Sequence, residues 1–492
     1  MAPRGLIPVL CYHATASEPQ RTAKYMANHA RIVLASALMA LAACTVGPDY
    51  KAPDTTLPPA KGTYTVTDAT PWWQDFNDPA LNALITQAAE ANPTVRQALA
   101  AVAGAREQIV EARAGGMPQL NASLGGTDAR SFSPPGYVTA HYGSASFDAS
   151  WEIDLWGKQR RTVEAANDNA DAAQAAADAA ALTLRGEVAR IYIAVRAAQA
   201  LPAQLQSEVT TAQYQLHVAS TREAGGDGTG LEKLQAQLLL LSAQSRIPTA
   251  QANVETNTHA LAALCGSFTL PADMTYSGTQ PSAAPPDDAG VPADLLRRRP
   301  DVREAERQLA QATAEIGVAE AARLPTLALS GSIGVSGNML NTMMALPIFA
   351  LGSSVKMPIF DAGAASARIA EAHARTEAAL WSYREAVATA VKDVQDSWSN
   401  LASARSRMVT LKQQVATGTR AVDIAVRAFH IGLVDFTTVI SVQQTLNQAN
   451  EDLIQARADE ATYLVALDKA LGGGYAAGVV AQAQAANKPA GS

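Results

Sequence analysis

Aromatic residues, cysteines and long apolar segments are all scarce in this chain of 492 residues. Only 5% of the residues are aromatic, which argues against a core built from large rings. The three cysteines, Cys11, Cys44 and Cys265, form no CxxC pair, so we expect neither a disulfide framework nor a zinc site. A mean hydropathy of -0.01 fits neither a bundle of membrane helices nor a disordered chain. The Ala-rich composition suits long, closely packed helices.

Basic clusters and catalytic motifs are also missing from the sequence. The formal net charge is -7 and no basic patch offsets it, so nucleic acid is not an expected partner. We find no nucleophile with a base, no metal-binding cluster and no phosphate loop, so we expect neither an enzyme nor a bound cofactor. His373 and His430 fall in a predicted long helix, where solvated or packed histidines are commoner than ligands.

An apolar run near the N-terminus predicts secretion. The run from Ile32 to Ala43 holds 12 residues, short of the ~20 that span a bilayer, so we expect a cleaved signal peptide. Leu41-Ala42-Ala43-Cys44 resembles a bacterial lipobox, in which the cysteine is acylated and becomes the mature N-terminus. The alternative is an ordinary signal peptide that ends near a cysteine. Thr45 replaces the Asp that retains lipoproteins in the inner membrane, which predicts sorting to the outer membrane, with a Pro-rich tether after it.

The sequence is a tandem duplication. Asn92-Pro93-Thr94-Val95-Arg96 and Arg299-Pro300-Asp301-Val302-Arg303 correspond at a shift of 207 residues. Further along the chain the shift is 206, which relates Gly226 to Gly432 and Gly266 to Gly472. Each half is predicted to contain a helix, two strands, a very long helix, a Gly-containing turn and a last helix.

Strands are predicted where apolar and polar residues alternate. The alternation is complete over residues 147–153, and it recurs at Leu327, Leu329, Ile333 and Val335, and again at Leu351, Val355, Met357 and Ile359. Segments of about 10 residues match tilted strands that cross a bilayer. Four strands cannot close a barrel, so we expect other copies of the chain to supply the rest. A soluble sheet with one wet face is the alternative.

Apolar residues recur every seven positions over residues 363–431, which contain no proline. This spacing predicts a coiled-coil seam that reaches on the order of 100 Å. The matching helix of the first half runs from Gly157 to about Glu223, with a kink expected at Pro202. The predicted seam consists of Leu380, Val387, Val394, Leu401, Met408, Val415, Val422 and Phe429.

These patterns divide the chain into six regions. They are a signal peptide with a possible upstream extension (1–43), a lipid-anchored tether with the start of an equatorial region (44–91), a first repeat (92–266), an equatorial connector (267–298), a second repeat (299–472) and a flexible tail (473–492).

Four motifs together resemble the outer-membrane factor family, in its TolC-type, NodT-type lipoprotein branch associated with resistance-nodulation-division pumps. They are the stretch from Trp72 to Leu81, the Asn92-Pro93 helix start, the stretch from Trp151 to Gly157, and Gly432-Leu433-Val434-Asp435-Phe436. The resemblance implies an α+β membrane protein: a homotrimer with a 12-stranded outer-membrane β-barrel, four strands per chain, continued by a helical coiled-coil tunnel in the periplasm. The implied partners are a periplasmic adaptor protein, an inner-membrane resistance-nodulation-division transporter and outer-membrane lipid.

The implied function is a passive exit duct for drugs or other small molecules. Its narrow end would lie at the turns near Gly226 and Gly432, where Asp227 and Asp435 are the acidic residues. Asp435 fits either a ring of like charge around the pore or a solvated or helix-capping aspartate. Ser441 stands where family members often carry a second acidic residue. A lipid-anchored coiled-coil scaffold without a pore is the alternative function.

Overall fold

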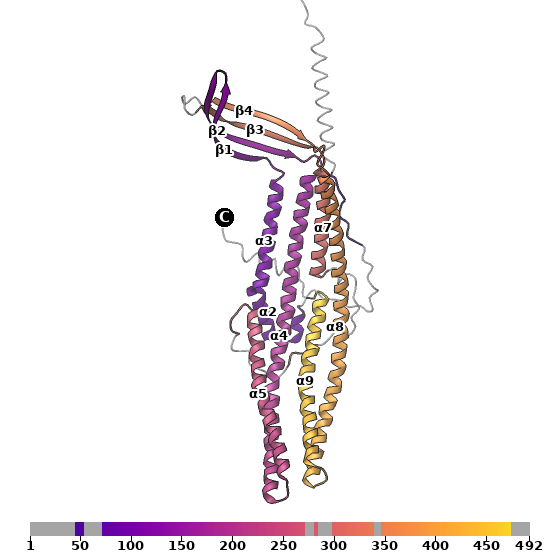
Figure 1. Cartoon of the computed structure of the whole chain (residues 1–492). Coiled ribbons are helices and arrows are strands. Elements are labelled where there is room, and N and C mark those ends of the chain that lie inside the picture. Colours follow the sequence, from indigo (N-terminus) through magenta and orange to yellow (C-terminus); the bar gives the residue numbers. More distant parts are fainter. Residues whose placement is uncertain (1–44, 54–70, 271–279, 284–297, 339–345, 474–492) are drawn as a thin grey trace, which may run out of the picture. The chain divides into compact units, whose positions relative to one another are not determined.

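The computed structural model describes residues 45–53, 71–270, 280–283, 298–338 and 346–473 (Figure 1). Cys44, the signal region, residues 54–70, most of the connector and the tail from residue 474 lie outside this description. The chain divides into two compact units. The sheet unit comprises Met1–Asp49, Glu111–Glu164 and Thr313–His373, and the helical unit comprises Tyr50–Val110, Ala165–Ala312 and Ala374–Ser492.

The two halves of the chain contain the same elements in the same order. The first half has α3 (Pro93–Ala114), β1 (Gln119–Ser133), β2 (Gly136–Ile153), α4 (Lys158–Gly225) and α5 (Gly230–Leu264). The second half has α7 (Pro300–Ala321), β3 (Thr326–Asn338), β4 (Leu346–Lys356), α8 (Ala364–His430) and α9 (Phe436–Ala470). A short 3-10 helix, η1 (Trp72–Phe76), and α2 (Pro79–Ala91) precede them. The duplication predicted from the sequence is therefore present in the fold.

The four strands form one antiparallel sheet in the order β1-β2-β3-β4. They are 15, 18, 13 and 11 residues long, so the predicted length of about 10 was too short for the first three. The β1–β2 hairpin continues into Gly-, Ser- and Thr-rich segments that carry no apolar alternation. The fourth strand ends at Lys356, so the prediction that Met357 and Ile359 belong to it was wrong. Pro358 lacks the N–H that a further ladder bond needs.

The helical unit is built on two helices of 68 and 67 residues, α4 and α8. All eight predicted seam positions of α8, from Leu380 to Phe429, are buried or half-buried, which confirms the seam. Helix α4 continues through Pro202. The main core joins η1 and α2 to α4, α8 and α9, and Tyr192, Leu81 and Leu467 are among its fully buried residues.

Several helix boundaries are repeated in the two halves. The Asn92 side-chain amide donates to the carbonyl of Leu264 (2.9 Å), and the Arg299 guanidinium donates to the carbonyl of Ala470 (3.1 Å). Each bond joins the residue before α3 or α7 to the end of α5 or α9. Gly226 and Gly432 have φ values of 81° and 74°, a left-handed conformation that favours glycine. These glycines end α4 and α8 and turn the chain into the next helix.

Candidate functional site

The strand register sorts the side chains of the sheet onto two faces. One face is apolar across all four strands, and the other is rich in serine on β1, β2 and β3 but carries Leu346, Ile348, Ala350 and Gly352 on β4. The apolar rows are Leu124, Ala145, Val335 and Pro347; Ala122, Phe147, Ile333 and Phe349; and Leu120, Ala149, Gly331 and Leu351. The opposite rows are Ser123, Ser146, Gly334 and Ile348; Asn121, Asp148, Ser332 and Ala350; and Gln119, Ser150, Ser330 and Gly352.

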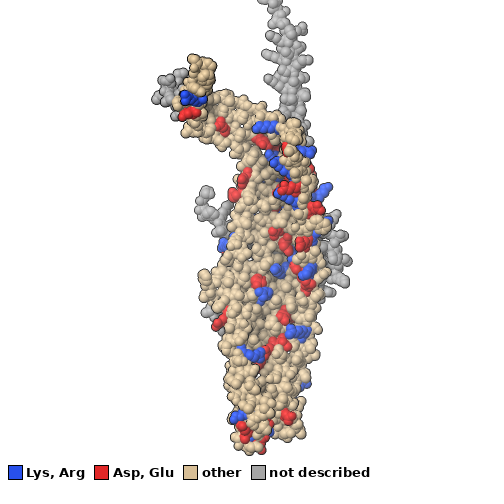
Figure 2. All heavy atoms as spheres, in the orientation of Figure 1, with Lys and Arg blue, Asp and Glu red and all other residues tan. Residues whose placement is uncertain are grey.

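The apolar face of the sheet is uncovered in the single chain. Phe147, Phe349 and Leu351 are 58%, 78% and 81% exposed. An apolar face of this extent needs hydrocarbon or another protein against it. Figure 2 shows few charged side chains over the sheet, whereas both signs of charge are scattered over the helices. The sheet is therefore suited to have lipid on one face and water on the other.

The serine-rich face carries a hydrogen-bonded carboxylate. Asp148 accepts bonds from the hydroxyls of Ser123 (2.5 Å) and Ser146 (2.9 Å). In the neighbouring strand a Cβ on Gly334 would lie 2.3 Å from the carbonyl oxygen of Ala145, so only glycine fits at that position. Small side chains beside one fixed carboxylate make this face a water-compatible lining.

Aromatic side chains stand near both ends of the β1–β2 hairpin. At the turn end, the rings of Phe132 and Tyr137 lie 5.2 Å apart, and the Arg130 guanidinium lies 4.7 Å from the Tyr137 ring. At the other end, the Trp151 indole donates to the carbonyl of Gly116 (2.9 Å). Trp151 borders the apolar rows, as aromatic residues at a membrane interface do, whereas Phe132 and Tyr137 lie eight residues beyond the row of Leu124 and Ala145.

The residues after Cys44 are fixed within the sheet unit. The Val46 amide donates to the carbonyl of Trp156 (3.1 Å). The Arg161 side chain, only 4% exposed, contacts the carboxylates of Asp49 (2.7 Å) and Glu164 (2.8 Å) and the carbonyls of Val46 and Gly47. These bonds raise the pKa of Arg161 despite its burial. The segment 45–49 is therefore held by hydrogen bonds and an ion pair, although Thr45, Pro48 and Asp49 are exposed. Arg161 was missed because it lies more than 100 residues away from Asp49 in sequence.

The two helix-to-helix turns place the candidate acidic residues differently. Asp227 directly follows Gly226, and its carbonyl accepts a bond from the Arg222 guanidinium (3.0 Å). Asp435 is three residues beyond Gly432 and is the first residue before α9, so its repeat equivalent is Thr229 rather than Asp227. Both aspartates are exposed. The Asp435 side chain accepts no capping hydrogen bond, whereas Thr229 accepts one from the Glu232 amide (3.3 Å), so the geometry gives no support to the capping interpretation.

A small apolar cluster joins the two turns within the helical unit. It comprises Ala219, Ala236, Ala425, Phe429, Phe436 and Val439, so all four long helices contribute. The Arg222 guanidinium lies 4.5 Å from the centre of the Phe429 ring. The two hairpins of one chain are therefore packed together near their ends.

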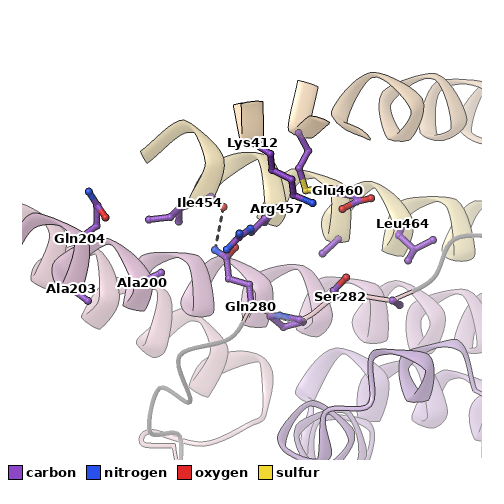
Figure 3. A pocket seen from close by; sticks show the side chains of 14 residues that line it. Ala200, Ala203, Gln204, Gln280, Ser282, Lys412, Ile454, Arg457, Glu460 and Leu464 are labelled. Atoms are coloured by element: carbon purple, nitrogen blue, oxygen red, sulfur yellow. Dashed lines mark hydrogen bonds between the residues drawn. The ribbon is translucent and has the colours of Figure 1, made fainter. Parts of the chain in front are cut away.

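A hollow of about 560 Å³ lies among α4, α8, α9 and residues 280–283 (Figure 3). The side-chain amide of Gln280 donates to the carbonyl of Ile454 (3.1 Å), which ties this part of the connector to α9. The lining combines Lys412, Arg457 and Glu460 with apolar side chains. Among the described residues, no group of three or more His, Cys, Asp or Glu is placed to hold a metal ion.

Cys265 and Asp468, both in the helical unit, are two ionisable groups whose pKa is raised by burial. Cys265 is fully buried, and burial raises the pKa of its thiol to about 11. Its repeat equivalent is Leu471, which is also buried, so Cys265 occupies an apolar core position. Burial, followed by the nearby charge of Asp75, raises the pKa of Asp468 to about 7.

Helices and sheet together define an outer-membrane channel protein with a helical periplasmic part. None of the described helices is long and apolar enough to be a membrane span. The chain belongs to the outer membrane efflux protein family, whose sequence pattern matches residues 84–267 and 291–473.

Individual relatives agree with this assignment. The chain is 30% identical to nodulation protein T of Rhizobium leguminosarum bv. viciae over 477 residues, 93% of this chain and 96% of that protein. It is 30% identical to the pyoverdine export outer membrane protein OpmQ of Pseudomonas aeruginosa over 425 residues, 85% of this chain and 90% of that protein. Its fold is similar to that of the outer-membrane channel OprN, with a TM-score of 0.80 and 29% identity, covering 88% of this chain and 99% of that one. The predicted family, fold, efflux function and outer-membrane location are confirmed.

Proposed function

We propose that three copies of this chain close a 12-stranded barrel and form the passive exit duct of a tripartite efflux system. The observation that carries this proposal is the two-faced sheet, whose apolar rows cross all four strands. Strands β1 and β4 are its edges, and an open edge is not tolerated in lipid. If β1 and β4 pair with edge strands of other copies, the backbone groups of both edges gain hydrogen-bond partners. The closed barrel then places the serine-rich face around water.

The partners of the duct are a periplasmic adaptor protein and an inner-membrane resistance-nodulation-division transporter, which supplies the energy. The cargo class is small molecules, including drugs, since relatives are named for pyoverdine export and for antibiotic efflux. A serine-lined passage offers little chemistry for selecting cargo. Selection therefore rests with the transporter, and catalysis is not part of the function.

The conductance of the protein in a bilayer and the mass of its assembly together test whether it forms a trimeric duct. The full-length protein, purified in detergent, is expected to give trimers in native mass spectrometry and discrete channels in planar bilayers. Ser332→Trp and Ser150→Trp on the serine-rich face should reduce conductance, whereas Ile333→Trp on the apolar face is the matched control and should not. Monomers that produce no channels would favour the scaffold without a pore.

Cys44 is proposed to carry the lipid anchor. The support is the lipobox together with the hydrogen-bonded segment that begins at Thr45, which holds the chain beside the end of β2. Metabolic labelling with palmitate should mark the wild-type protein and Cys265→Ala but not Cys44→Ala. Label retained by Cys44→Ala would contradict the anchor.

Asp435, and more weakly Asp227, are proposed to line the narrow end of the duct. The support is their exposure at the two turns and the lack of a capping bond to the Asp435 side chain. Three carboxylates near one axis favour cations. Asp435→Ala should lower cation selectivity in single-channel reversal potentials, with Asp227→Ala producing the smaller change. Unchanged reversal potentials for both variants would remove the gate assignment and leave the duct intact.

A further inference from the structure

The β1–β2 hairpin extends beyond the rest of the described sheet. The β2–β3 ladder ends at the pair Tyr142 and Asn338, so residues 127–141 continue as two paired strands past the described end of β3. We call residues 127–141 the ribbon. Both strands connect to helices at their other ends, since β1 follows α3 and β2 leads into α4. With the helices in the periplasm, the ribbon lies at the outer surface of the membrane.

One face of the ribbon continues the apolar rows of the sheet. The β1–β2 register runs without a bulge up to the turn at residues 134–135, so the alternation of side chains between the two faces is preserved. Even-numbered residues of β1 and odd-numbered residues of β2 therefore stay on the apolar side. In the ribbon this side, which we call the ribbon face, consists of the pairs Asp128 and His141, Arg130 and Thr139, and Phe132 and Tyr137.

The ribbon face lies beyond the reach of a phospholipid that covers the apolar rows. Arg130 and Phe132 are six and eight residues past Leu124 along β1. At about 3.4 Å per residue and a strand tilt of about 40°, they stand up to about 16 and 21 Å above the row of Leu124. A phospholipid headgroup layer is only about 5 to 8 Å thick. A lipid whose headgroup is a chain of sugars is long enough to reach these side chains.

A guanidinium and two aromatic rings form the outermost part of the ribbon face. The Arg130 guanidinium lies 4.7 Å from the centre of the Tyr137 ring, and the rings of Phe132 and Tyr137 lie 5.2 Å apart. Phe132 and Tyr137 are 62% and 66% exposed. Within the described parts of the chain, Arg130 forms no ion pair with a carboxylate. Its N–H groups are therefore available to an anion, beside rings that offer flat apolar area.

The one acidic residue of the ribbon has a partner of its own. Asp128 contacts His141 across the two strands (Oδ1 to Nδ1, 2.5 Å). This pair stands between the apolar rows and Arg130. The imidazole offsets the charge of Asp128 when it is protonated, and otherwise occupies one of the carboxylate oxygens. Arg130 is left as the charged side chain of the ribbon face that can bind a ligand.

We propose that the ribbon face binds the phosphorylated sugars of the glycolipid in the outer leaflet of the outer membrane. Arg130 donates two parallel hydrogen bonds to a phosphate, and Phe132 and Tyr137 pack on the sugar rings. The ribbon face is continuous with the apolar rows, so one lipid covers the rows with its acyl chains and reaches the ribbon with its headgroup. This inference rests on the proposed duct, because the closed barrel places the apolar rows in the membrane.

Lipid binding by the full-length protein in detergent tests the proposal. The probes are lipopolysaccharide with phosphorylated core sugars, the same lipopolysaccharide after chemical removal of its phosphates, and phosphatidylglycerol. Native mass spectrometry of the trimer over a titration measures each affinity. Arg130→Gln should weaken binding of the phosphorylated probe by roughly tenfold to a hundredfold, the effect of losing a charged hydrogen bond, and should leave binding of the dephosphorylated probe unchanged. Tyr137→Ala should weaken binding of both lipopolysaccharides severalfold.

Two matched variants control for charge and for aromatic area. Arg113→Gln removes an exposed arginine from the end of α3, on the periplasmic side of the sheet. Tyr142→Ala removes a tyrosine that is 51% exposed, from the same hairpin but from its opposite face. Neither should change the affinity for lipopolysaccharide.

The outcomes separate this inference from the duct itself. Equal binding of the phosphorylated probe by the wild-type protein, Arg130→Gln and Tyr137→Ala, in trimers that still conduct, would overturn the inference and leave the duct standing. Phosphatidylglycerol bound as tightly as lipopolysaccharide would also overturn it, because the sugars would then contribute nothing. Monomers without channels would overturn both proposals, since the ribbon would have no membrane beside it.

Discussion

The α4/α5 and α8/α9 hairpins descend from one repeated sequence, yet their exposed faces differ. On α5 the first hairpin exposes four leucines, Leu231, Leu234, Leu238 and Leu241, and α9 of the second hairpin has Thr437, Ile440, Gln444 and Asn447 at the equivalent positions. The first hairpin has Arg246 between two carboxylates, whereas the equivalent of Arg246 in the second is Asp452. Turn geometry and core positions are shared. The divergence lies in exposed side chains of the last helix of each hairpin and in the ion pairs of Arg246.

Exchanging residues between the two hairpins is expected to have the largest effect on the difference between them. Leu238→Gln with Leu241→Asn gives α5 the residues of α9 and removes two leucines that are exposed in the single chain and that would each contribute about 2 kcal/mol if the proposed trimer buries them. We expect trimers to dissociate at protein concentrations roughly a hundredfold to a thousandfold higher than for the wild-type protein. The reciprocal Gln444→Leu with Asn447→Leu should change dissociation little. Mass measurements over a dilution series in detergent check both, and equal effects would contradict the asymmetry.

The polar contact inside the chain is the next point of difference. Arg246→Ala leaves the buried Glu208 facing Glu451, and we expect a loss of about 3 kcal/mol of stability at pH 8. Burial, and then the charge of Glu451, raises the pKa of Glu208, so its folded form binds a proton more tightly than its unfolded form. The loss should therefore shrink toward pH 5. Thermal unfolding at both pH values measures it, with the exposed Arg407→Ala as control, for which less than about 1 kcal/mol is expected.

The equivalent of Asp468 in the first half is the buried Ala262, so the second half has an acidic residue where the first half has an apolar one. Burial and Asp75 raise the pKa of Asp468 to about 7 in the folded protein. The folded state thus favours the neutral acid, and stability should fall as pH rises from about 4 through about 7. Asp468→Asn should add about 2 kcal/mol at pH 8 and almost nothing at pH 4. Melting temperatures across this range test it, and a gain independent of pH would contradict the raised pKa.

The smallest expected difference is between the first turns of α5 and α9, which follow the two helix-to-helix turns. Thr229 caps α5 through its hydroxyl, whereas the equivalent Asp435 makes no capping bond to α9. Thr229→Ala should therefore cost about 1 kcal/mol of local stability, and Asp435→Ala less than about half of that. Hydrogen exchange of the first amides of α5 and α9 measures both. Equal losses would restore the capping interpretation of Asp435.

Sequence periodicity was sufficient to predict the elements whose apolar residues follow a regular spacing. The seam from Leu380 to Phe429 follows the seven-residue spacing along its whole length, and the alternating segments place Phe147, Ile333 and Leu351 on one face of the sheet. Both are local patterns, in which the position of a residue within the repeat determines which face of the helix or strand it lies on. The long distal parts of β1 and β2 were missed because glycine, serine and threonine follow no apolar alternation.

Contacts between distant residues could not be predicted in this way. Arg161 and Asp49 lie 112 residues apart, and no pattern in either segment indicates that they form an ion pair. Asp227 and Asp435 were both predicted at the narrow end because they are the acidic residues at the two turns. The helix boundaries show that they occupy different positions of the turn, so residue type was a poorer guide there than the repeat shift of 206 residues.

Three pairs of glycines hold left-handed backbone at equivalent places in the two halves: Gly157 and Gly363, Gly226 and Gly432, and Gly266 and Gly472. Side chains elsewhere have diverged as far as cysteine and leucine, or alanine and aspartate, but any other residue at these positions is strained. The two halves therefore have the same backbone conformation before their long helices, at their helix-to-helix turns and after their last helices. A gene that encodes one half twice should still fold its hairpins.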